Sequence, residues 1–262
     1  MVQPLLSDKV AIVTGGARGI GKSIALKFAE HGCSIAIADI LIEEGNKTAN
    51  EIEKMGRSAI FIPCDVTRSE QVYSMVNQTI RKFGKIDILV NNAGGISIAR
   101  TSGIEQSEED WDKLINLNLK SAFLFCRAVA PLMRARRYGK IINISSIGVI
   151  SPPECNPGYA AAKAGMIGLT IDLATELAPF NVNVNAILPG PIRGTGFLEG
   201  RSLADIEAFW EEAAKKHVPF RRCGMPEDVA NTALFLASDL SSFITGALIP
   251  VSGGIPLPVR SI

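Results

Sequence analysis

Apolar and polar positions follow two rhythms that alternate along this chain. Short apolar runs rich in β-branched residues predict strands at residues 10–14, 34–38, 58–64, 86–91, 140–145, 182–188 and 247–251. Longer segments with apolar residues three and four positions apart predict helices at residues 20–31, 42–55, 69–83, 108–136, 159–178 and 226–238. Continuous apolar runs are typical of buried strands, and a period near 3.6 is typical of helices.

The regular alternation of strand and helix determines the expected fold. Consecutive strands joined by helices form a parallel sheet, because right-handed connections place the helices on the faces of the sheet. We therefore expect an α/β fold, a doubly wound parallel sheet of about seven strands with helices on both faces. No long polar linker divides residues 1–262, which predicts a single domain.

One stretch, residues 190–222, interrupts the alternation. It begins after Pro189 and carries a helical pattern at residues 203–216. It follows the carboxyl end of a predicted strand, which is where doubly wound sheets bind ligands. We expect this insertion to be a lid that binds substrate.

Small residues mark several predicted helix ends. Four glycines stand where helices should stop, as glycines in a left-handed conformation do: Gly32, Gly56, Gly84 and Gly139. Ser69 and Ser107 each precede acidic residues, which predicts that both serines are N-caps.

Composition excludes several classes of protein. The 27 Lys and Arg residues balance 26 Asp and Glu residues, so no basic surface for nucleic acid is expected. No apolar run approaches the ~20 residues of a membrane span, and the start of the chain does not resemble a signal peptide. The five cysteines are scattered without a Cys/His cluster, which predicts no metal site and a reducing, cytoplasmic location.

The first predicted strand leads directly into a glycine-rich loop, Gly15-Gly16-Ala17-Arg18-Gly19-Ile20-Gly21, and then into a helix. Glycines in this place allow a tight turn and let the backbone approach a pyrophosphate, while the helix N-terminus supplies free N–H groups. We expect a dinucleotide to contact Gly15, Arg18, Gly19, Ile20 and Gly21.

Asp39, at the end of the second strand, indicates which dinucleotide binds. It lies eighteen residues after Gly21, near the distance at which an acidic residue accepts hydrogen bonds from the adenosine ribose. Its charge would repel a 2′-phosphate, and the next residue, Ile40, offers no cation. Arg18 is the one residue that favours NADP, because a guanidinium group could reach a 2′-phosphate. Asp39 and Ile40 outweigh it, and we therefore predict NAD over NADP.

Polar residues also close the third and fourth strands. Asp65 and Val66 follow one, and Asn92, Ala93 and Gly94 follow the other. Both groups lie at carboxyl strand ends, where such sheets bind ligands. Because an amide both donates and accepts, Asn92 fits a structural role and a cofactor contact equally well.

Tyr159 and Lys163 stand four residues apart on a predicted helix and therefore share a face. A phenol has a pKa of ~10, and a neighbouring ammonium group lowers it toward neutrality. That combination suits a tyrosine to general acid/base catalysis. Ser146 lies thirteen residues before the tyrosine.

These residues and their order resemble the short-chain dehydrogenase/reductase family, a single-domain group with a Rossmann fold. The resemblance extends from Lys9 to Gly254. The matching pieces are Thr14-Gly15-x3-Gly19-x-Gly21, Asp65, Asn91-Asn92-Ala93-Gly94, Asn118, Asn143-x-x-Ser146, Tyr159-x3-Lys163 and Pro189-Gly190.

The resemblance implies four catalytic residues. Tyr159 would exchange a proton with the alcohol or ketone oxygen, and Ser146 would hydrogen-bond that oxygen. Lys163 would assist Tyr159 and hold the nicotinamide ribose, and Asn118 would support a water behind Lys163. The spacing to Tyr159 favours Ser146 over its neighbour Ser145 for the serine role.

The resemblance also implies further cofactor contacts. These are the backbone at Asn92, Ala93, Gly94, Ile144, Pro189, Gly190 and Ile192, and the adenine contacts at Asp65 and Val66. The family often places a threonine four residues after the glycine of Pro-Gly. Here Gly194 has that position and Thr195 follows, so Thr195 is the candidate for the nicotinamide amide.

The predicted function is an NAD-dependent oxidoreductase that interconverts a secondary alcohol and a ketone. Ser146, Tyr159 and Cys155 are expected to contact this small-molecule substrate, although Cys155 fits a buried filler equally well. The alternative is a 3-oxoacyl-[acyl-carrier-protein] reductase, which usually prefers NADPH. The resemblance further implies a homotetramer, with no metal.

Overall fold

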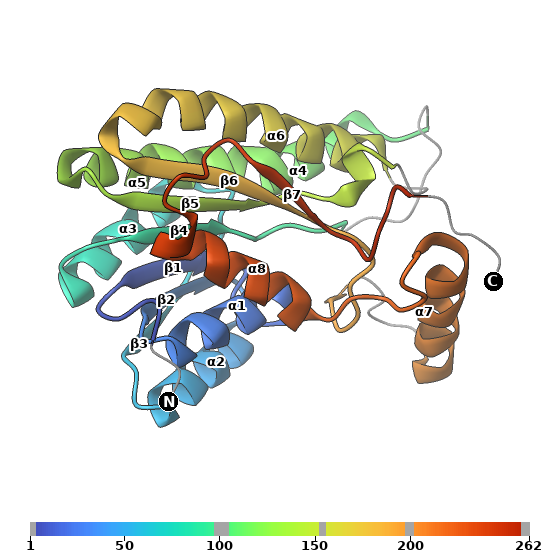
Figure 1. Cartoon of the computed structure of the whole chain (residues 1–262), viewed down its shortest axis with the longest axis horizontal. Coiled ribbons are helices and arrows are strands. Elements are labelled where there is room, and N and C mark those ends of the chain that lie inside the picture. Colours follow the sequence, from blue (N-terminus) through green and yellow to red (C-terminus); the bar gives the residue numbers. More distant parts are fainter. Residues whose placement is uncertain (1–3, 97–104, 152–155, 197–201, 258–262) are drawn as a thin grey trace.

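Seven parallel strands form one sheet in the computed structural model, in the order β3-β2-β1-β4-β5-β6-β7 (Figure 1). The structure describes residues 4–96, 105–151, 156–196 and 202–257. The strands are β1 (Val10–Thr14), β2 (Ser34–Asp39), β3 (Ala59–Pro63), β4 (Ile88–Asn91), β5 (Gly139–Ile144), β6 (Val182–Pro189) and β7 (Leu248–Val251). The predicted parallel sheet is confirmed, and every predicted strand boundary lies within two residues of the observed one.

Helices cover both faces of the sheet (Figure 1). On one face lie α1 (Gly19–Glu30), α2 (Ile42–Lys54) and α8 (Pro226–Ala237). On the other lie α3 (Ser69–Phe83), α5 (Ser121–Arg136) and α6 (Pro157–Leu177). Successive strand residues point to opposite faces, so Val13 packs under the first group of helices and Ile12 under the second.

The order of the strands creates a switch point between β1 and β4, which pair through Ala11–Ile88, Ile12–Leu89 and Val13–Val90. The chain moves outward from β1 in one direction through β2 and β3, and in the other through β4 to β7. Loops leaving β1 and β4 therefore diverge to opposite faces and leave a crevice at the carboxyl edge, where ligands of such folds bind.

The long helix predicted at residues 108–136 is divided by a wider turn. It consists of α4 (Glu108–Ile115), a π-helical turn (Asn116–Lys120) and α5. Asn118 lies in this turn, and its Nδ2 donates to the Leu114 carbonyl oxygen at 3.1 Å. The apolar period could not reveal the turn, because a side-chain bond to the backbone competes with the regular helical bond.

Two of the predicted helix ends were wrong. Gly84 does end α3 in a left-handed conformation, with φ 78°, but Gly139 lies inside β5. Arg137, with φ 52°, makes the left-handed turn after α5 instead. Ser107 caps α4 by accepting from the Asp110 N–H, whereas Ser69 is already the first residue of α3.

The inserted helix α7 (Leu203–His217) stands beyond the carboxyl ends of the strands, apart from the two helical layers (Figure 1). Arg193 holds it from the side of β6 through an ion pair of 3.0 Å to Glu207. After α7 the chain returns to the end of β7, where the Phe220 N–H donates to the Gly253 carbonyl at 3.0 Å.

Short 3₁₀ turns complete the structure at Ile147–Val149, Ala178–Phe180 and Asp239–Ser241. None of the helices in the described ranges is long and apolar enough to cross a membrane. Among the same residues, no group of three or more His, Cys, Asp or Glu side chains is placed to hold a metal ion.

Candidate active site

The glycine-rich loop between β1 and α1 is folded so closely that a side chain would not fit at Gly15 or Gly21. Gly15 and Gly19 have φ of 64° and 57°, the left-handed region that glycine adopts without strain. A Cβ atom on Gly15 would lie 2.8 Å from Asn92 Nδ2 and 2.9 Å from Ala93 Cα. The loop therefore presents bare backbone, as binding a pyrophosphate requires.

Helix α1 begins at Gly19 without a side-chain cap. The first N–H groups of a helix have no partner within the helix, and together with the helix dipole they attract an anion. The bare loop and the uncapped helix start fit a dinucleotide pyrophosphate, as expected for Gly15, Gly19, Ile20 and Gly21.

Asp39 at the end of β2 is buried and braces this loop. Its Oδ2 accepts the Ala17 N–H at 2.9 Å, and its Oδ1 accepts the Leu41 N–H at 3.1 Å. A carboxylate has further lone pairs on both oxygens, so these bonds leave room for ribose hydroxyls. Ile40 beside it is 68% exposed and open to a ligand.

Asn92 links the two strands that flank the switch point. Its Nδ2 donates to the carbonyl oxygens of Thr14 and Gly15, at 2.9 and 3.1 Å. The Thr14 hydroxyl in turn accepts the N–H groups of Asn92 and Ala93, both at 2.9 Å. The Asn92 amide thus has a structural role. Thr14 is a contributor that the sequence motif contained but to which we assigned no role.

Asp65 follows β3 and forms a local turn. Its Oδ1 accepts the N–H of Thr67 at 2.9 Å and the hydroxyl of Thr67 at 2.7 Å. Val66 is buried beside it. The turn holds both residues at the carboxyl edge of the sheet, on the β2–β3 side where Asp39 also lies.

Lys163 is a buried cation, 4% exposed, on the first turns of α6. Its Nζ donates to the carbonyl oxygen of Ile144, at the end of β5, at 2.8 Å. Burial lowers the pKa of this lysine from 10.5 to about 8. The Nζ also lies 5.7 Å from the centroid of the Tyr159 ring, so the ammonium group and the aromatic ring are close neighbours.

The two neighbouring serines have different surroundings. The Ser145 hydroxyl is buried and donates to the Lys163 carbonyl oxygen at 2.8 Å. Ser146 is partly exposed, and its hydroxyl oxygen accepts the Gly148 N–H at 3.1 Å. Since accepting leaves its own proton available, Ser146 has a donor to offer to a ligand, whereas the Ser145 proton is already used.

Asn118 joins the site from the π-helical turn. Its Oδ1 accepts the Gly95 N–H at 2.8 Å, and its Nδ2 donates to the Gly95 carbonyl at 3.0 Å. Gly94 lies between this side chain and Lys163, because a Cβ there would be 2.5 Å from Asn118 Oδ1 and 3.3 Å from Lys163 Nζ. The end of β4 is thereby held between two catalytic candidates.

The segment after β6 covers the glycine-rich loop. A Cβ on Gly19 would lie 3.6 Å from the Gly194 carbonyl oxygen and 3.7 Å from Thr195 Cα. The Thr195 hydroxyl donates to the Ile192 carbonyl at 3.2 Å. Gly194 and Thr195 therefore lie next to the glycine-rich loop at Gly19, and Thr195 is bonded to Ile192; their contacts with a cofactor stay predictions.

Two further predicted contacts lie at the start of that segment. Pro189 ends β6, and the Gly190 N–H donates to the Val251 carbonyl oxygen of β7 at 2.9 Å. A Cβ on Gly190 would approach Ser252 Cα to 2.8 Å, so the strand ends are in close contact. Cys155, the third expected substrate contact, lies outside the described residues, as does the part of the insertion at 197–201.

Arg18, the possible NADP signal, packs against the insertion. A Cβ on Gly196 would lie 2.7 Å from Arg18 Nη2, which places the guanidinium directly on the Gly196 backbone. The side chain therefore spans from the cofactor loop to the segment above it. Its position makes it a contact between these two parts of the site.

Known proteins share this arrangement. The family model described as enoyl-(acyl carrier protein) reductase matches residues 15–256. The chain is 39% identical over 250 residues to 3-oxoacyl-[acyl-carrier-protein] reductase FabG of Thermotoga maritima, covering 95% of this chain and 98% of that protein. It is 36% identical over 249 residues to 7alpha-hydroxysteroid dehydrogenase of Escherichia coli, covering 95% and 94%.

Solved structures agree with this similarity. The crystal structure of an NAD⁺-bound xylitol dehydrogenase superposes with a TM-score of 0.87 at 32% identity. The match covers 95% of this chain and 99% of that chain.

Proposed function

The chain belongs to the short-chain dehydrogenase/reductase family, and from this premise we propose that it oxidises a secondary alcohol to a ketone, reversibly, with NAD. Members of the family are oxidoreductases that act on CH–OH groups and ketones with a nicotinamide cofactor. The observation that carries the proposal is the convergence of Lys163, Tyr159 and Asn118 beside the bare glycine-rich loop.

The proposed roles follow from the contacts. A bound nicotinamide would accept the hydride. Ser146 would donate its free hydroxyl proton to the substrate oxygen and hold it beside Tyr159. Tyr159 would take the hydroxyl proton during oxidation and return it during reduction. Lys163, fixed by the Ile144 carbonyl, would keep a positive charge beside the phenol and stabilise its ionised form.

Two observations support NAD as the cofactor. The buried Asp39 carboxylate is bonded to the Ala17 N–H of the glycine-rich loop, where we propose that the adenosine ribose binds, and its charge would oppose a phosphate there. Arg18 is packed on Gly196. We propose that Arg18 serves the insertion above the loop rather than a 2′-phosphate. A kcat/KM higher with NADPH than with NADH would overturn this preference.

A second candidate is reduction of a 3-oxoacyl group on an acyl carrier protein. It is favoured by the 39% identity to the Thermotoga maritima reductase over nearly the whole chain. The same four residues would perform this reaction, so the two candidates differ in substrate and in direction rather than in chemistry.

A substrate panel distinguishes these candidates. The purified protein is mixed with NAD and secondary alcohols, sugar alcohols or hydroxysteroids, and the NADH absorbance is followed. A parallel assay uses 3-oxoacyl thioesters with NADH or NADPH. We expect turnover of an alcohol with NAD. Turnover confined to thioesters would instead support the reductase, and absence of turnover with every compound would contradict both.

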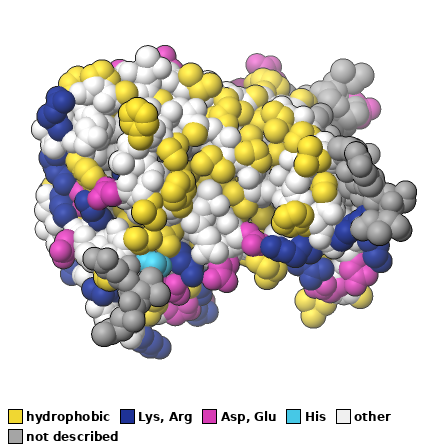
Figure 2. All heavy atoms as spheres, in the orientation of Figure 1, with side chains coloured by type: hydrophobic (Ala, Val, Ile, Leu, Met, Phe, Trp, Pro, Cys, Tyr) yellow, Lys and Arg dark blue, Asp and Glu magenta, His cyan; other side chains and the backbone are white. Residues whose placement is uncertain are grey.

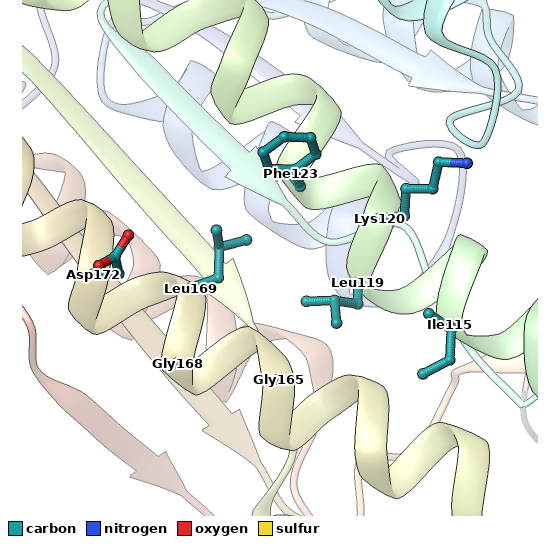
Figure 3. A pocket seen from close by; sticks show the side chains of 8 residues that line it. All are labelled: Ile115, Leu119, Lys120, Phe123, Gly165, Gly168, Leu169 and Asp172. Atoms are coloured by element: carbon teal, nitrogen blue, oxygen red, sulfur yellow. The ribbon is translucent and has the colours of Figure 1, made fainter.

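We also propose that the protein assembles as a homotetramer through two separate apolar surfaces. The first is a groove of about 480 Å³ between the π-helical turn, α5 and α6 (Figure 3). Ile115, Leu119, Phe123 and Leu169 line it, and Lys120 and Asp172 stand toward its opposite ends. A copy related by a two-fold axis would place its acid against this lysine and its lysine against this acid.

The second surface lies on α8, β7 and the connection between them, where Figure 2 shows hydrophobic side chains gathered on one face. Leu240 is 66% exposed, and Phe243 is fully exposed. Pairing through two different two-fold interfaces builds a closed tetramer rather than a dimer, and we propose that both surfaces pair in this way.

A further inference from the structure

Helix α6 receives a cap from a distant part of the chain. The helix begins at Pro157, and the side chain of its N-cap residue Asn156 makes no capping bond. The Gly158 N–H instead donates to Gln106 Oε1 at 2.9 Å, across 52 residues of sequence. The first N–H groups of a helix need such acceptors from outside. Gln106 therefore holds the turn that carries Tyr159, the next residue.

The contact between Gln106 and this turn is close. A Cβ on Gly158 would lie 3.3 Å from Gln106 Oε1, from Trp111 Cα and from Leu114 Cδ1. Leu114 also accepts the bond from Asn118 Nδ2 through its carbonyl oxygen. The segment from Gln106 to Asn118 thus braces the first turn of α6, and at its far end Asn118 faces Lys163 across Gly94.

The other half of the Gln106 amide is unpartnered. Its Nε2 is shielded from solvent and has no hydrogen-bond partner among the residues that the structure describes. A buried donor without an acceptor is destabilising, and such groups mark positions that serve another purpose. An apolar residue would avoid the cost but would leave the Gly158 N–H without an acceptor.

A glutamate would cap the helix more strongly, because a carboxylate favours a helix N-terminus. It would also place a negative charge next to Tyr159 and oppose the phenolate that catalysis requires. A neutral amide is the side chain of this length that accepts the bond without that charge.

We propose that Gln106 is a positioning residue for Tyr159, a neutral remote cap that fixes the first turn of α6 without adding charge. The proposal rests on the proposed function, in which Tyr159 exchanges the substrate proton. Among the described residues, the charged side chains on the two segments that meet at this turn are Lys163 on α6 and Glu105, Glu108, Glu109, Asp110, Asp112 and Lys113 on the Gln106 side. Lys113 pairs with Glu109 at 2.8 Å and approaches Asp110 to 3.9 Å.

Gln106→Leu tests the acceptor. We expect kcat for alcohol oxidation to fall on the order of tenfold or more, because small displacements of a reacting group are costly. The Kd for NADH should stay within about twofold, since Gln106 lies away from the glycine-rich loop. The variant also removes the unpartnered nitrogen, so its Tm should change little. Unchanged kcat would overturn the proposal.

Ser107→Ala is the matched control, because it removes the neighbouring cap of α4 and leaves that of α6 intact. We expect it to lower Tm while kcat stays near wild type. An equal loss of kcat in this control and in Gln106→Leu would show that any damage to α4 suffices, which overturns the proposal.

Gln106→Glu tests the neutrality of the cap. The carboxylate keeps the acceptor, so kcat should recover toward wild type at high pH. The midpoint of the rise in kcat with pH should move upward, because a nearby negative charge opposes phenol ionisation. A merely structural cap predicts an unmoved midpoint and would contradict the proposal. If the wild-type protein oxidises no alcohol while binding NADH, the proposed function fails instead.

Discussion

Lys163 is a buried cation that reduces the stability of the fold at the place where we propose that the reaction occurs. Its ammonium group is buried and bonded to the Ile144 carbonyl, and burial lowers its pKa to about 8. The folded protein therefore holds this proton less tightly than the unfolded chain, where the pKa is 10.5. Between these two values the unfolded state binds more protons, so stability rises with pH across that window and is lowest below it.

Lys163→Met should separate the effect of the buried ammonium group on stability from its effect on turnover. We expect the apoprotein to be more stable at pH 7 by about 1 to 2 kcal/mol, because the buried charge is removed and the lost bond to Ile144 offsets only part of the gain. Its stability should also lose the rise between pH 8 and 10.5. Thermal unfolding across pH measures both, and turnover should be abolished. A variant less stable than wild type at pH 7 would argue against a costly buried cation.

The two serines permit an equally direct comparison. Ser146→Ala should lower kcat by ~10²-fold or more, the usual size of a hydrogen bond that acts on the reacting oxygen. Ser145→Ala removes a buried bond to the Lys163 carbonyl and should mainly lower Tm. Steady-state kinetics of both variants with one alcohol shows which serine acts on the substrate oxygen. A greater loss of kcat in Ser145→Ala would reverse the assignment.

At the scale of elements, the segment that follows β4 forms a close junction between α6 and the π-helical turn. Gly94 lies between Asn118 on the π-helical turn and Lys163 on α6. Gly94→Ala would push at least one of these side chains away, since the nearest atom is 2.5 Å from the added methyl group. We expect kcat to fall by on the order of 10²-fold. Gly56→Ala is the control, because open space surrounds Gly56 and only its left-handed backbone is strained.

Elements were predictable where the reason for them is local. The apolar run at Ala59–Pro63 identifies β3, and Ser107 identifies the start of α4, because both depend on neighbouring residues. The π-helical turn depends on Asn118 binding both Leu114 and Gly95, a contact 23 residues away. Gly139 was taken for a helix end because its place in β5 depends on pairing with β6 at Val182.

The candidate site likewise contains local relations that the sequence predicts and long-range contacts that it does not. Tyr159 and Lys163 were found because four residues on a helix fix their relation, and the structure brings their groups together. The bonds from Asn92 to Thr14 and from Gln106 to Gly158 join strands and helices that only the assembled sheet makes adjacent. No pattern along the chain reports which amide will meet which backbone group.

At the scale of the whole molecule, the two proposed apolar interfaces predict a tetramer that separates into dimers when either interface is broken. Wild-type protein should have four times the 28.0 kDa chain mass by light scattering. Phe123→Asp and Phe243→Asp each place a charge on one surface, and each should halve that mass. The double variant should be monomeric. Leu203→Asp, at the exposed start of α7, is the control and should leave the mass unchanged. A monomeric wild-type protein would refute the assembly.

The proton exchange at Tyr159 is the central claim, and Tyr159→Phe removes only the phenolic oxygen. Its kcat should be measured with the best alcohol of the panel, alongside the Kd for NADH. We predict loss of turnover with an unchanged Kd, because the ring remains over Lys163 and the glycine-rich loop is untouched. Retention of more than a few per cent of kcat, set against the ~10²- to 10⁴-fold effect of such a group, would contradict the account.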